Sequence, residues 1–446
     1  MSQNKEPKFC QLGMAGLNFK HRRVDLCYRA TNGSGPHTGR TEHWDTIKSA
    51  LDDPILAKQR LALLNGEWPI ERSEGLERSP CADCMKAEAA NFPSYREKID
   101  LTDQITDEWL RSNVDPVTGV MKHPVRVEFR FSNVCNQACR HCNADYSTKW
   151  AKIVKNNWEE LEEYSFHSKT FSDKQNRFEI FGSVHDDSLE YSTASKIDME
   201  SLVPYLKAVK DHETTGVPDF MEIEITGGEP FFQRETYEFL EAVKEYAPWI
   251  VLIITTNGSI AGKFKRYNLN ELLKPFGKVV LKFSLDSDRH FYDYFREGGD
   301  YQRVRDNIEQ IKQDLPKASI EIVISTTNMQ AARFANIYDE FKEITSPENF
   351  TMCEVQQPKI YTPYVLPNEL KEIYLNDWKN YVQTLDEDEQ HIANELSIFP
   401  VRCLEDRNFD AETWHEFCVY TDKLDKINGK RVFDYFPEWE EYWTTK

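Results

Sequence analysis

The feature that most constrains this chain is a regular alternation of strand-like and helix-like segments that begins near residue 125. Strands are predicted at 125–131, 221–226, 251–256, 280–286, 320–326 and 352–357. Amphipathic segments between them, such as 235–246, 301–315 and 331–344, predict helices. Strands that alternate with helices form parallel sheets or barrels, because each parallel connection needs a long crossover. The expected fold class is therefore α/β.

Polar and apolar residues alternate within several of these strands. In the first, Val125, Val127, Phe129 and Phe131 share one face, and Arg126, Glu128 and Arg130 share the other. A closed eight-stranded barrel fills its interior with branched apolar side chains. A repeated polar face therefore favours a partial (β/α)6 TIM-like barrel with a wet or ligand-filled interior. The alternative is that these polar groups only pair with one another.

The chain divides into four parts by pattern. Residues 1–100 are irregular, carry four cysteines and allow a β-hairpin at 20–30, which predicts a small module held by a metal cluster, and 101–124 form a linker. Residues 125–360 form the predicted barrel, with an insertion at 150–200 because the first connection is unusually long. Residues 361–446 form a helical, acidic extension that closes on an aromatic run, namely Phe433, Tyr435, Phe436, Trp439, Tyr442 and Trp443. We expect this run to pack on the barrel; the alternative is a plug over its interior.

Charge and hydropathy limit the partners. The formal net charge is −20, which argues against binding that tracks nucleic-acid phosphates. The apolar runs have strand length, and the first residues lack the charged-then-apolar pattern of a signal peptide. We therefore expect a cytoplasmic protein without a membrane segment. Ten cysteines in such a chain indicate metal or redox chemistry rather than disulfides, because the cytosol keeps thiols reduced.

One cysteine group follows the first predicted strand directly. Cys135, Cys139 and Cys142 lie within the sequence CNQACRHC, at the strand end where barrel active sites are built. Iron–sulfur clusters usually take four thiolates, so three on one loop imply an iron with an open coordination position. A zinc site would need a fourth protein ligand, and His141 is poorly placed beside Cys142.

At this point the sequence resembles the radical S-adenosylmethionine (SAM) enzymes over about residues 125–360. CNQACRHC matches their CxxxCxxC motif, and the sequence GGEP at 227–230 matches their glycine-rich SAM motif. Further matching segments end the later strands: TNG at 256–258, SLD at 284–286 and STTN at 325–328. A lone motif of either kind is weak, but their order on successive strands is specific. The resemblance implies a SAM-ligated [4Fe–4S] cluster on Cys135, Cys139 and Cys142.

The same resemblance implies a SAM pocket. Gly227, Gly228 and Glu229 would meet the ammonium group of SAM, with the glycines allowing close backbone approach. Arg296 would meet the carboxylate, the alternative being a surface arginine before a turn. The ribose or the substrate would contact Ser284, Asp286, Ser325 and, with a weaker claim, Asn257, because Asn-Gly is also a simple turn. His141 stands where relatives carry an aromatic residue that covers the adenine.

A second cysteine group lies near the N-terminus: Cys10, Cys27, Cys81 and Cys84. It resembles the "twitch" module, a small auxiliary-cluster domain of some radical SAM proteins, although here it precedes the barrel instead of following it. Four thiolates would fully ligate a second [4Fe–4S] cluster, which suits electron transfer. The alternative is structural zinc on the same cysteines. The segments SN at 132–133, STKW at 147–150 and LDKING at 424–429 add to the likeness with twitch-domain radical SAM proteins.

The expected function is reductive cleavage of SAM to methionine and a 5′-deoxyadenosyl radical, which takes a hydrogen atom from an unidentified substrate. The resemblance implies a small polyol or sugar derivative, or a peptide side chain, and an electron donor such as flavodoxin or ferredoxin. The rival function is a non-catalytic iron–sulfur electron carrier or a zinc-stapled binding protein. We expect Cys353, Cys403 and Cys418 to be buried thiols, with Cys403 and Cys418 as candidate hydrogen-atom donors.

Overall fold

A computed structural model describes residues 9–20, 23–27, 47–73, 76–89, 94–98, 105–144, 146–161, 163–164, 199–210, 221–355 and 358–444. Most of the predicted insertion at 150–200 lies outside these residues. The chain forms two compact units, and each is described by itself. The first comprises Met1–Asn133, Ser192–Ile254 and Lys265–Val279, and the second comprises Val134–Tyr191, Thr255–Phe264 and Val280–Lys446.

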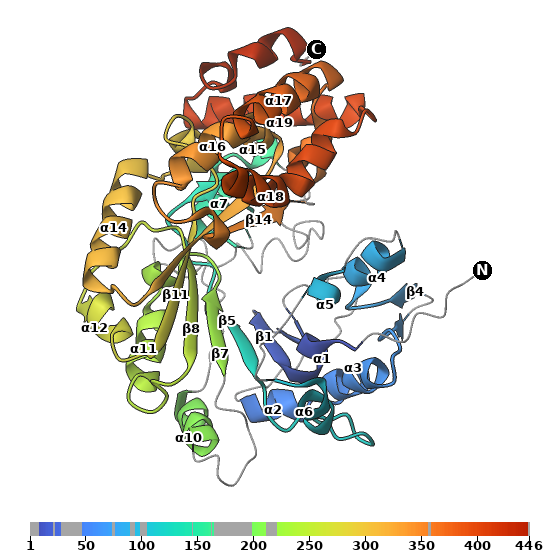
Figure 1. Cartoon of the computed structure of the whole chain (residues 1–446), viewed down its shortest axis with the longest axis vertical. Coiled ribbons are helices and arrows are strands. Elements are labelled where there is room, and N and C mark those ends of the chain that lie inside the picture. The colour runs from blue at the N-terminus through green and yellow to red at the C-terminus, as the bar shows by residue number, and fades with distance from the viewer. Residues whose placement is uncertain are drawn as a thin grey trace. The chain divides into compact units, whose positions relative to one another are not determined.

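The first unit is built on five strands in the order β2-β1-β5-β7-β8. These are β1 (Gly16–Lys20), β2 (Arg23–Asp25), β5 (Arg126–Arg130), β7 (Glu222–Thr226) and β8 (Val251–Thr256). Strands β1, β5, β7 and β8 run parallel, and β2 is antiparallel to β1. The remaining elements are α1 (Gln11–Ala15), α2 (Ile47–Leu51), α3 (Pro54–Leu64), β3 (Glu71–Ser73), β4 (Leu76–Arg78), α4 (Ala82–Ala89), α5 (Tyr95–Lys98), α6 (Asp107–Ser112), α10 (Met199–Lys210), η4 (Pro230–Phe232), α11 (Arg234–Val243), β10 (Tyr267–Asn268) and α12 (Leu269–Leu273). Figure 1 shows β5, β7 and β8 side by side.

The N-terminal hairpin is present but begins and ends earlier than the predicted range of 20–30. Its first strand, β1, pairs in parallel with β5, so that Phe19 lies opposite Phe129. Their rings lie 5.1 Å apart between centroids. Residues near the N-terminus therefore extend the sheet that contains the first predicted barrel strand. Sequence periodicity does not predict this pairing, because the residue pattern of one strand does not indicate which other strand it pairs with.

The alternation predicted for β5 is confirmed. Val127 and Phe129 are fully buried, and the Phe129 ring packs 5.6 Å from Phe239 of α11. On the other face, Glu128 accepts hydrogen bonds from Asn18 at 2.7 Å and from Thr226 at 2.8 Å. Other charged groups of this face also form ion pairs, Arg126 with Glu222 and Glu224, and Arg130 with Glu128. Within the first unit, these polar groups thus pair with one another.

The second unit contains three parallel strands in the order β14-β13-β11, namely β11 (Lys278–Ser284), β13 (Ser319–Thr326) and β14 (Phe350–Glu354). Its other elements are β6 (Ala138–Cys139), α7 (Thr148–Asn156), α8 (Trp158–Leu161), β9 (Lys263–Phe264), α13 (Tyr292–Phe295), β12 (Arg296–Glu297), α14 (Tyr301–Asp314), α15 (Asn328–Ala332), α16 (Phe334–Phe341), η5 (Pro347–Asn349), η6 (Lys359–Tyr361), η7 (Pro363–Val365), α17 (Asn368–Val382), α18 (Glu387–Glu405), α19 (Ala411–Asn428), η8 (Val432–Asp434) and η9 (Pro437–Tyr442). The helix predicted at 331–344 is instead two helices, α15 and α16, separated at Arg333. Both units are α/β structures on parallel strands, as predicted; the partial barrel, the twitch module and the domain boundaries stay predictions.

The C-terminal aromatic run packs on the segment that follows β11. Tyr435 stacks on Tyr294 with ring centroids 4.4 Å apart, and Phe436 meets Phe291 edge-on at 5.5 Å. Trp439 is fully buried. Such aromatic pairs contribute about 0.5–1.5 kcal/mol each beyond the apolar area that they bury. The extension is thereby fixed to residues 291–295, beside the element β12.

Candidate functional site

The cysteine loop, defined here as residues 135–142, is tied to the segment after β11 through the main chain. Cys139 lies in β6, which pairs antiparallel with β12, so that Cys139 lies opposite Arg296. The Arg140 amide donates to the Phe295 carbonyl at 2.9 Å. Within the loop, the Cys142 amide donates to the Cys139 carbonyl at 2.9 Å. Cys139 and Cys142 therefore belong to one folded turn that backbone hydrogen bonds fix to residues 295–297.

Helix α7 holds the same loop from its N-terminus. The Ser147 hydroxyl caps α7 by accepting from the Trp150 amide at 3.2 Å, and it donates to the Gln137 carbonyl at 2.6 Å. The Thr148 hydroxyl accepts from the Cys135 amide at 3.2 Å. The capping residue that starts the helix thus also fixes the backbone of the loop.

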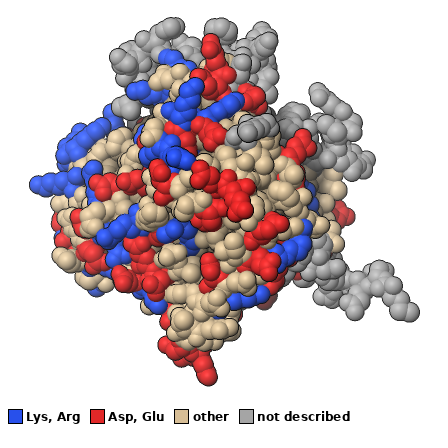
Figure 2. Space-filling view, turned by 90° about the horizontal axis from the view of Figure 1, so that it is seen from above, with Lys and Arg blue, Asp and Glu red and all other residues tan. Residues whose placement is uncertain are grey.

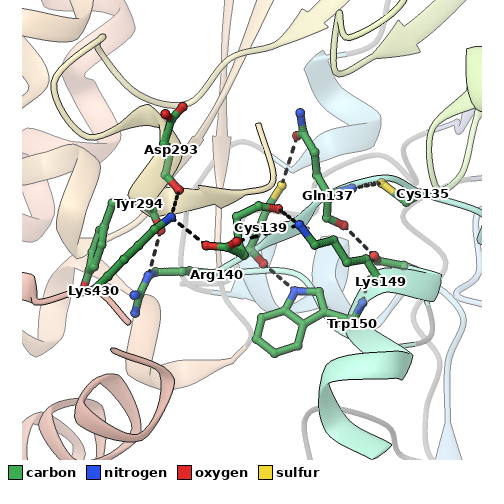
Figure 3. Close-up of polar contacts among 11 residues, drawn as sticks. Cys135, Gln137, Cys139, Arg140, Lys149, Trp150, Asp293, Tyr294 and Lys430 are labelled. Carbon is green, nitrogen blue, oxygen red and sulfur yellow. Dashed lines mark hydrogen bonds and ion pairs between the residues drawn. The ribbon is translucent and has the colours of Figure 1, made fainter. Parts of the chain in front are cut away.

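Two further side chains of α7 reach the loop and its partner strand (Figure 3). The indole Nε1 of Trp150 donates to the Cys139 carbonyl at 2.8 Å, and Trp150 is fully buried. Lys149 Nζ donates to the Glu297 carbonyl at 3.0 Å. The segment STKW therefore supports the cysteine turn, a role that the sequence analysis did not assign to it.

The chemistry of the three thiols fits a group that takes thiolate ligands. Burial raises the pKa of Cys139, and burial followed by the charges of Cys139 and Cys135 raises the pKa of Cys142 well above its usual range. Three thiolates this close repel one another unless positive charge lies among them, and iron of an iron–sulfur cluster supplies that charge. Across the described ranges, no three Cys, His, Asp or Glu side chains are arranged to hold a single metal ion.

Three predicted site residues meet beside the loop. Asp286 and Arg296 form a buried ion pair, and Asp286 also accepts from the Ser325 amide at 2.7 Å. Arg296 donates to the Leu285 carbonyl at 3.1 Å and to the Gln137 side chain at 3.3 Å. The alternative of a surface arginine is therefore wrong, since Arg296 is only 4% exposed. Each of its three nitrogens already has an acceptor in the protein.

Asp286 occupies an unusual backbone conformation. Its φ of 61° lies in the left-handed region, which residues with a Cβ adopt rarely and at a cost. Asp is among the better tolerated residues there, because its short side chain can hydrogen-bond locally. The bonds to Arg296 and to the Ser325 amide offset that cost. Ser284, the last residue of β11, is half-buried two positions earlier.

Asn257 both forms a turn and contacts the cysteine loop. Its Oδ1 accepts from the Ser259 amide at 2.9 Å, which is an Asx-turn of the kind that Asn-Gly predicts. Its Nδ2 donates to Asn136 Oδ1 at 2.9 Å, and Asn136 in turn donates to the Ser259 hydroxyl at 3.1 Å. Asn136 lies between the first two cysteines, so the turn after β8 positions that part of the loop.

His141 is half-buried and stacks on Phe295, with ring centroids 5.3 Å apart and an angle of 15° between the planes. Burial lowers the pKa of His141, so its ring is neutral near pH 7. A neutral imidazole stacked on a phenyl ring presents a flat, weakly polar surface. The resemblance predicts that His141, beside Cys142, contacts the adenine of SAM, and this stays a prediction.

The glycine-rich segment at 227–230 belongs to the first unit and forms a tight turn. Gly227 has a φ of 125°, and a Cβ there would lie 2.8 Å from the Ser132 carbonyl oxygen. The Gly228 amide donates to that same carbonyl at 3.1 Å. Glu229 is fully buried, and its carboxylate caps η4 by accepting from the Phe231 amide at 3.0 Å. This close approach explains why glycine stands at position 227.

The N-terminal cysteines come together within the first unit. Cys10 caps α1, where its sulfur accepts from the Gly13 amide at 3.4 Å. Burial raises the pKa of Cys10 to about 11, and the charge of Cys84 raises it further. Burial also raises the pKa of Cys81, and the charges of Cys10, Cys27 and Cys84 add to the effect. Residues separated by more than seventy positions in sequence are thus within electrostatic range of one another.

The remaining cysteines are placed partly as predicted. Cys403 and Cys418 are fully buried, on α18 and α19, whereas Cys353 on β14 is only half-buried.

Sequence reasoning missed a buried polar contact of the loop, the 2.5 Å ion pair between Arg140 and Asp425. The segment LDKING, which contains Asp425, was recognised only as a likeness.

Comparison with known proteins gave weak structural likenesses alone. No family model matches the chain, and no curated protein matches it. Among solved structures, "Native anSMEcpe with bound AdoMet" is 16% identical with a TM-score of 0.37, over 58% of this chain and 60% of that one. The structure of anSMEcpe with AdoMet and the Kp18Cys peptide is 18% identical, with a TM-score of 0.36, over 60% and 61%. SuiB of Streptococcus suis bound to S-adenosylmethionine is 13% identical, with a TM-score of 0.30, over 68% and 57%. The chain thus spans about three fifths of the length of each.

Proposed function

We propose that this chain is a radical SAM enzyme, which cleaves SAM reductively to methionine and a 5′-deoxyadenosyl radical that abstracts a hydrogen atom from a substrate. One observation carries this proposal. Cys135, Cys139 and Cys142 share one loop, which Ser147 at the start of α7 and strand β12 hold through its backbone and which the turn after β8 holds through the Asn136 side chain. A ligand loop must hold its geometry while one iron stays open to SAM, and this loop is braced on all of those sides.

In this proposal the three cysteines hold a [4Fe–4S] cluster, and the cluster supplies the electron for SAM cleavage. The residues around the cluster orient it and shield it from solvent. Gln137 accepts from Arg296 and faces the Cys139 sulfur at 3.8 Å, so it links the ion pair to the ligand loop. The Arg296 guanidinium favours the ionised form of the Cys139 thiol, and the carboxylate of its partner Asp286 opposes that effect.

The SAM pocket is also part of the proposal. The residues proposed for it are Asn257, Ser284, Asp286, Arg296 and Ser325 of the second unit and, from the first, Gly227, Gly228 and Glu229, which follow β7. Glu229 suits this role because it is fully buried, and a buried carboxylate pairs favourably with a cation such as the SAM ammonium.

We further propose a second [4Fe–4S] cluster on Cys10, Cys27, Cys81 and Cys84. The grouping supports it, because Cys10, Cys27 and Cys84 lie within electrostatic range of Cys81, and a cationic cluster would stabilise the ionised form of these thiols. Structural zinc on the same four cysteines is the alternative, and the metal content decides between them.

The proposed substrate remains a class: a small polyol or sugar derivative, or a peptide side chain, with flavodoxin or ferredoxin as electron donor in the cytoplasm. In the part of the chain that the structure describes, no helix has the length and apolar character needed to cross a membrane. On the face in Figure 2, the basic and acidic side chains of the described residues are interspersed. This mixture, with a net charge of −20, supports the absence of a nucleic-acid partner.

The test is anaerobic reconstitution with iron and sulfide. The wild-type chain should bind about eight irons and produce 5′-deoxyadenosine from SAM under a strong reductant. The triple variant of Cys135, Cys139 and Cys142 to Ala should lose about four irons and all SAM cleavage. A matched control, Cys353→Ala, removes a cysteine outside both groups and should keep both properties.

A triple variant with unchanged iron would refute the assignment. Iron binding without any 5′-deoxyadenosine in the wild type would favour the electron-carrier function. Stoichiometric zinc from an anaerobic preparation, lost on replacing the four N-terminal cysteines, would show a structural site there.

A further inference from the structure

Arg140 lies within the cysteine loop, between the second and third cysteines, but its side chain engages distant parts of the chain. Its Nε donates to the Tyr294 carbonyl at 3.0 Å, and a terminal nitrogen donates to Asp425 at 2.5 Å. Its guanidinium carbon lies 3.7 Å from the centroid of the Tyr294 ring. Arg140 is 1% exposed, so these contacts lie in the interior of the second unit.

Asp425 is the point at which the C-terminal extension meets this loop. It lies near the end of α19, and its second carboxylate oxygen accepts from the Val432 amide at 2.6 Å. Its backbone carbonyl accepts from the Lys430 amide at 3.0 Å. Between them, Gly429 ends the helix in the left-handed conformation, with a φ of 65°. One carboxylate therefore joins the helix end, the turn that follows it and the cysteine loop.

The same turn holds the other side of the loop. Lys430 Nζ donates to the Asp293 carbonyl at 2.5 Å and to Glu297 at 2.6 Å (Figure 3). Glu297 belongs to β12, the strand that pairs with Ala138 and Cys139. Residues 425–430, named here the clasp, thus contact Arg140, which directly follows β6, and Glu297 of β12.

The contacts of the clasp exceed what attaching the extension requires. Tyr435 and Phe436 of the extension already pack on Tyr294 and Phe291, with ring centroids 4.4 and 5.5 Å apart. Apolar packing of this kind attaches a helix without directional bonds. A buried ion pair costs desolvation and adds little net stability, but its bonds have fixed directions. The Arg140–Asp425 pair therefore fixes an orientation, and the orientation that it fixes is that of the cysteine loop.

We propose that Arg140 and Asp425 are positioning residues: the clasp sets the geometry of the cysteine loop, so the C-terminal extension controls how the ligand cysteines are presented. The catalytic consequence of this proposal rests on the proposed radical SAM function, whereas its structural part does not. Loss of the pair should let the loop open locally while α7 still holds its other end. The cysteines would then still be able to hold the proposed cluster, but in a less fixed orientation.

The experiment compares Asp425→Asn with Asp422→Asn. The first keeps the side-chain shape and removes the charge that Arg140 needs. The control changes an aspartate on the same helix, whose carboxylate accepts from Trp443 at 3.1 Å. Hydrogen exchange on the reduced, metal-free chain measures opening of the loop directly, because the Arg140 amide is bonded to the Phe295 carbonyl and the Cys142 amide to the Cys139 carbonyl. We expect exchange over 135–142 to accelerate about tenfold in Asp425→Asn and to stay at the wild-type rate in Asp422→Asn.

Reconstituted protein supplies the second measurement. Asp425→Asn should retain its iron, while the change that SAM causes in the electron paramagnetic resonance spectrum of the reduced cluster is diminished and 5′-deoxyadenosine formation falls about tenfold. Asp425→Glu, which restores the charge, should recover part of both. A global loss of structure would leave the spectrum of the surviving fraction unchanged and would not be rescued by Glu.

Wild-type exchange over 135–142 in a folded Asp425→Asn variant would overturn the proposal. If that variant does not fold, Arg140→Lys is used, which keeps the charge and loses the paired nitrogens; unchanged loop exchange in it would equally overturn the proposal. Failure of the proposed function appears differently, as a wild-type chain that binds no iron or does not cleave SAM, while the exchange experiment still reports on the clasp.

Discussion

Ser147→Ala removes one hydroxyl and with it two hydrogen bonds, one that caps α7 and one that holds the cysteine loop. The hydroxyl caps the helix and also donates to the Gln137 carbonyl. Loss of an N-cap to Ala costs about 1 kcal/mol, and loss of an internal hydrogen bond costs about another 1 kcal/mol. The local opening free energy of 135–156 should therefore fall by about 2 kcal/mol. Since every 1.4 kcal/mol is a factor of ten, amide exchange there should accelerate roughly 30-fold.

A second variant, Ser147→Gly, separates the contribution of the helix cap from that of the hydrogen bond to Gln137. Glycine at an N-cap costs only a few tenths of a kcal/mol relative to serine, so this variant loses mainly the bond to Gln137. Its opening free energy should fall by about 1.3 kcal/mol, which is roughly a tenfold acceleration. The control is Thr106→Ala, which removes the N-cap of α6 in the first unit and should leave 135–156 unchanged.

The assay is hydrogen exchange by mass spectrometry on the reduced, metal-free chain, resolved to peptides of α7 and of the cysteine loop. Equal acceleration in the Ala and Gly variants would show that the cap contributes nothing. Wild-type exchange in both variants would refute the claim that Ser147 holds the loop.

Three other outcomes follow from the structure. Glu229→Gln keeps the shape but removes the charge, so SAM affinity by anaerobic calorimetry should weaken by about 1.5–3 kcal/mol; unchanged affinity would show that the ammonium is held elsewhere. Gly227→Ala places a Cβ 2.8 Å from the Ser132 oxygen at a positive φ, and thermal unfolding should report a loss of about 1–3 kcal/mol; a wild-type melting temperature would contradict the backbone geometry. Burial raises the pKa of Cys403 and of Cys418 to about 12, so both stay protonated at pH 8, and iodoacetamide should leave them unlabelled in mass spectra of the native chain; labelling at wild-type stability would contradict their burial.

The alternation of polar and apolar residues along a strand predicted which face of that strand is buried. The period-two alternation of β5 identified Val127 and Phe129 as buried, because side chains on successive strand residues point to opposite faces. It also identified Glu128 as a residue of the other face, but not its partners Asn18 and Thr226, which come from other strands.

The candidate site shows the same division. The spacing of the three cysteines and the position of Arg296 were legible in sequence, and Arg296 lies beside the cysteine loop. The contacts of its guanidinium with Asp286 and Gln137 could not be predicted from the sequence, because they depend on which strand ends lie next to each other. Asp425 had no local signal at all, since its partner lies in a distant turn.

The distance along the chain between Arg140 and Asp425 has a consequence for synthesis in the cell. They are 285 residues apart. At the usual rate of translation, about 5–20 residues per second, roughly 15–60 s pass between the emergence of the cysteine loop and the synthesis of Asp425. During that interval the three thiols are present without their clasp. If the three cysteines hold the proposed cluster, delivery of iron and sulfide after release from the ribosome is therefore the favourable order of events.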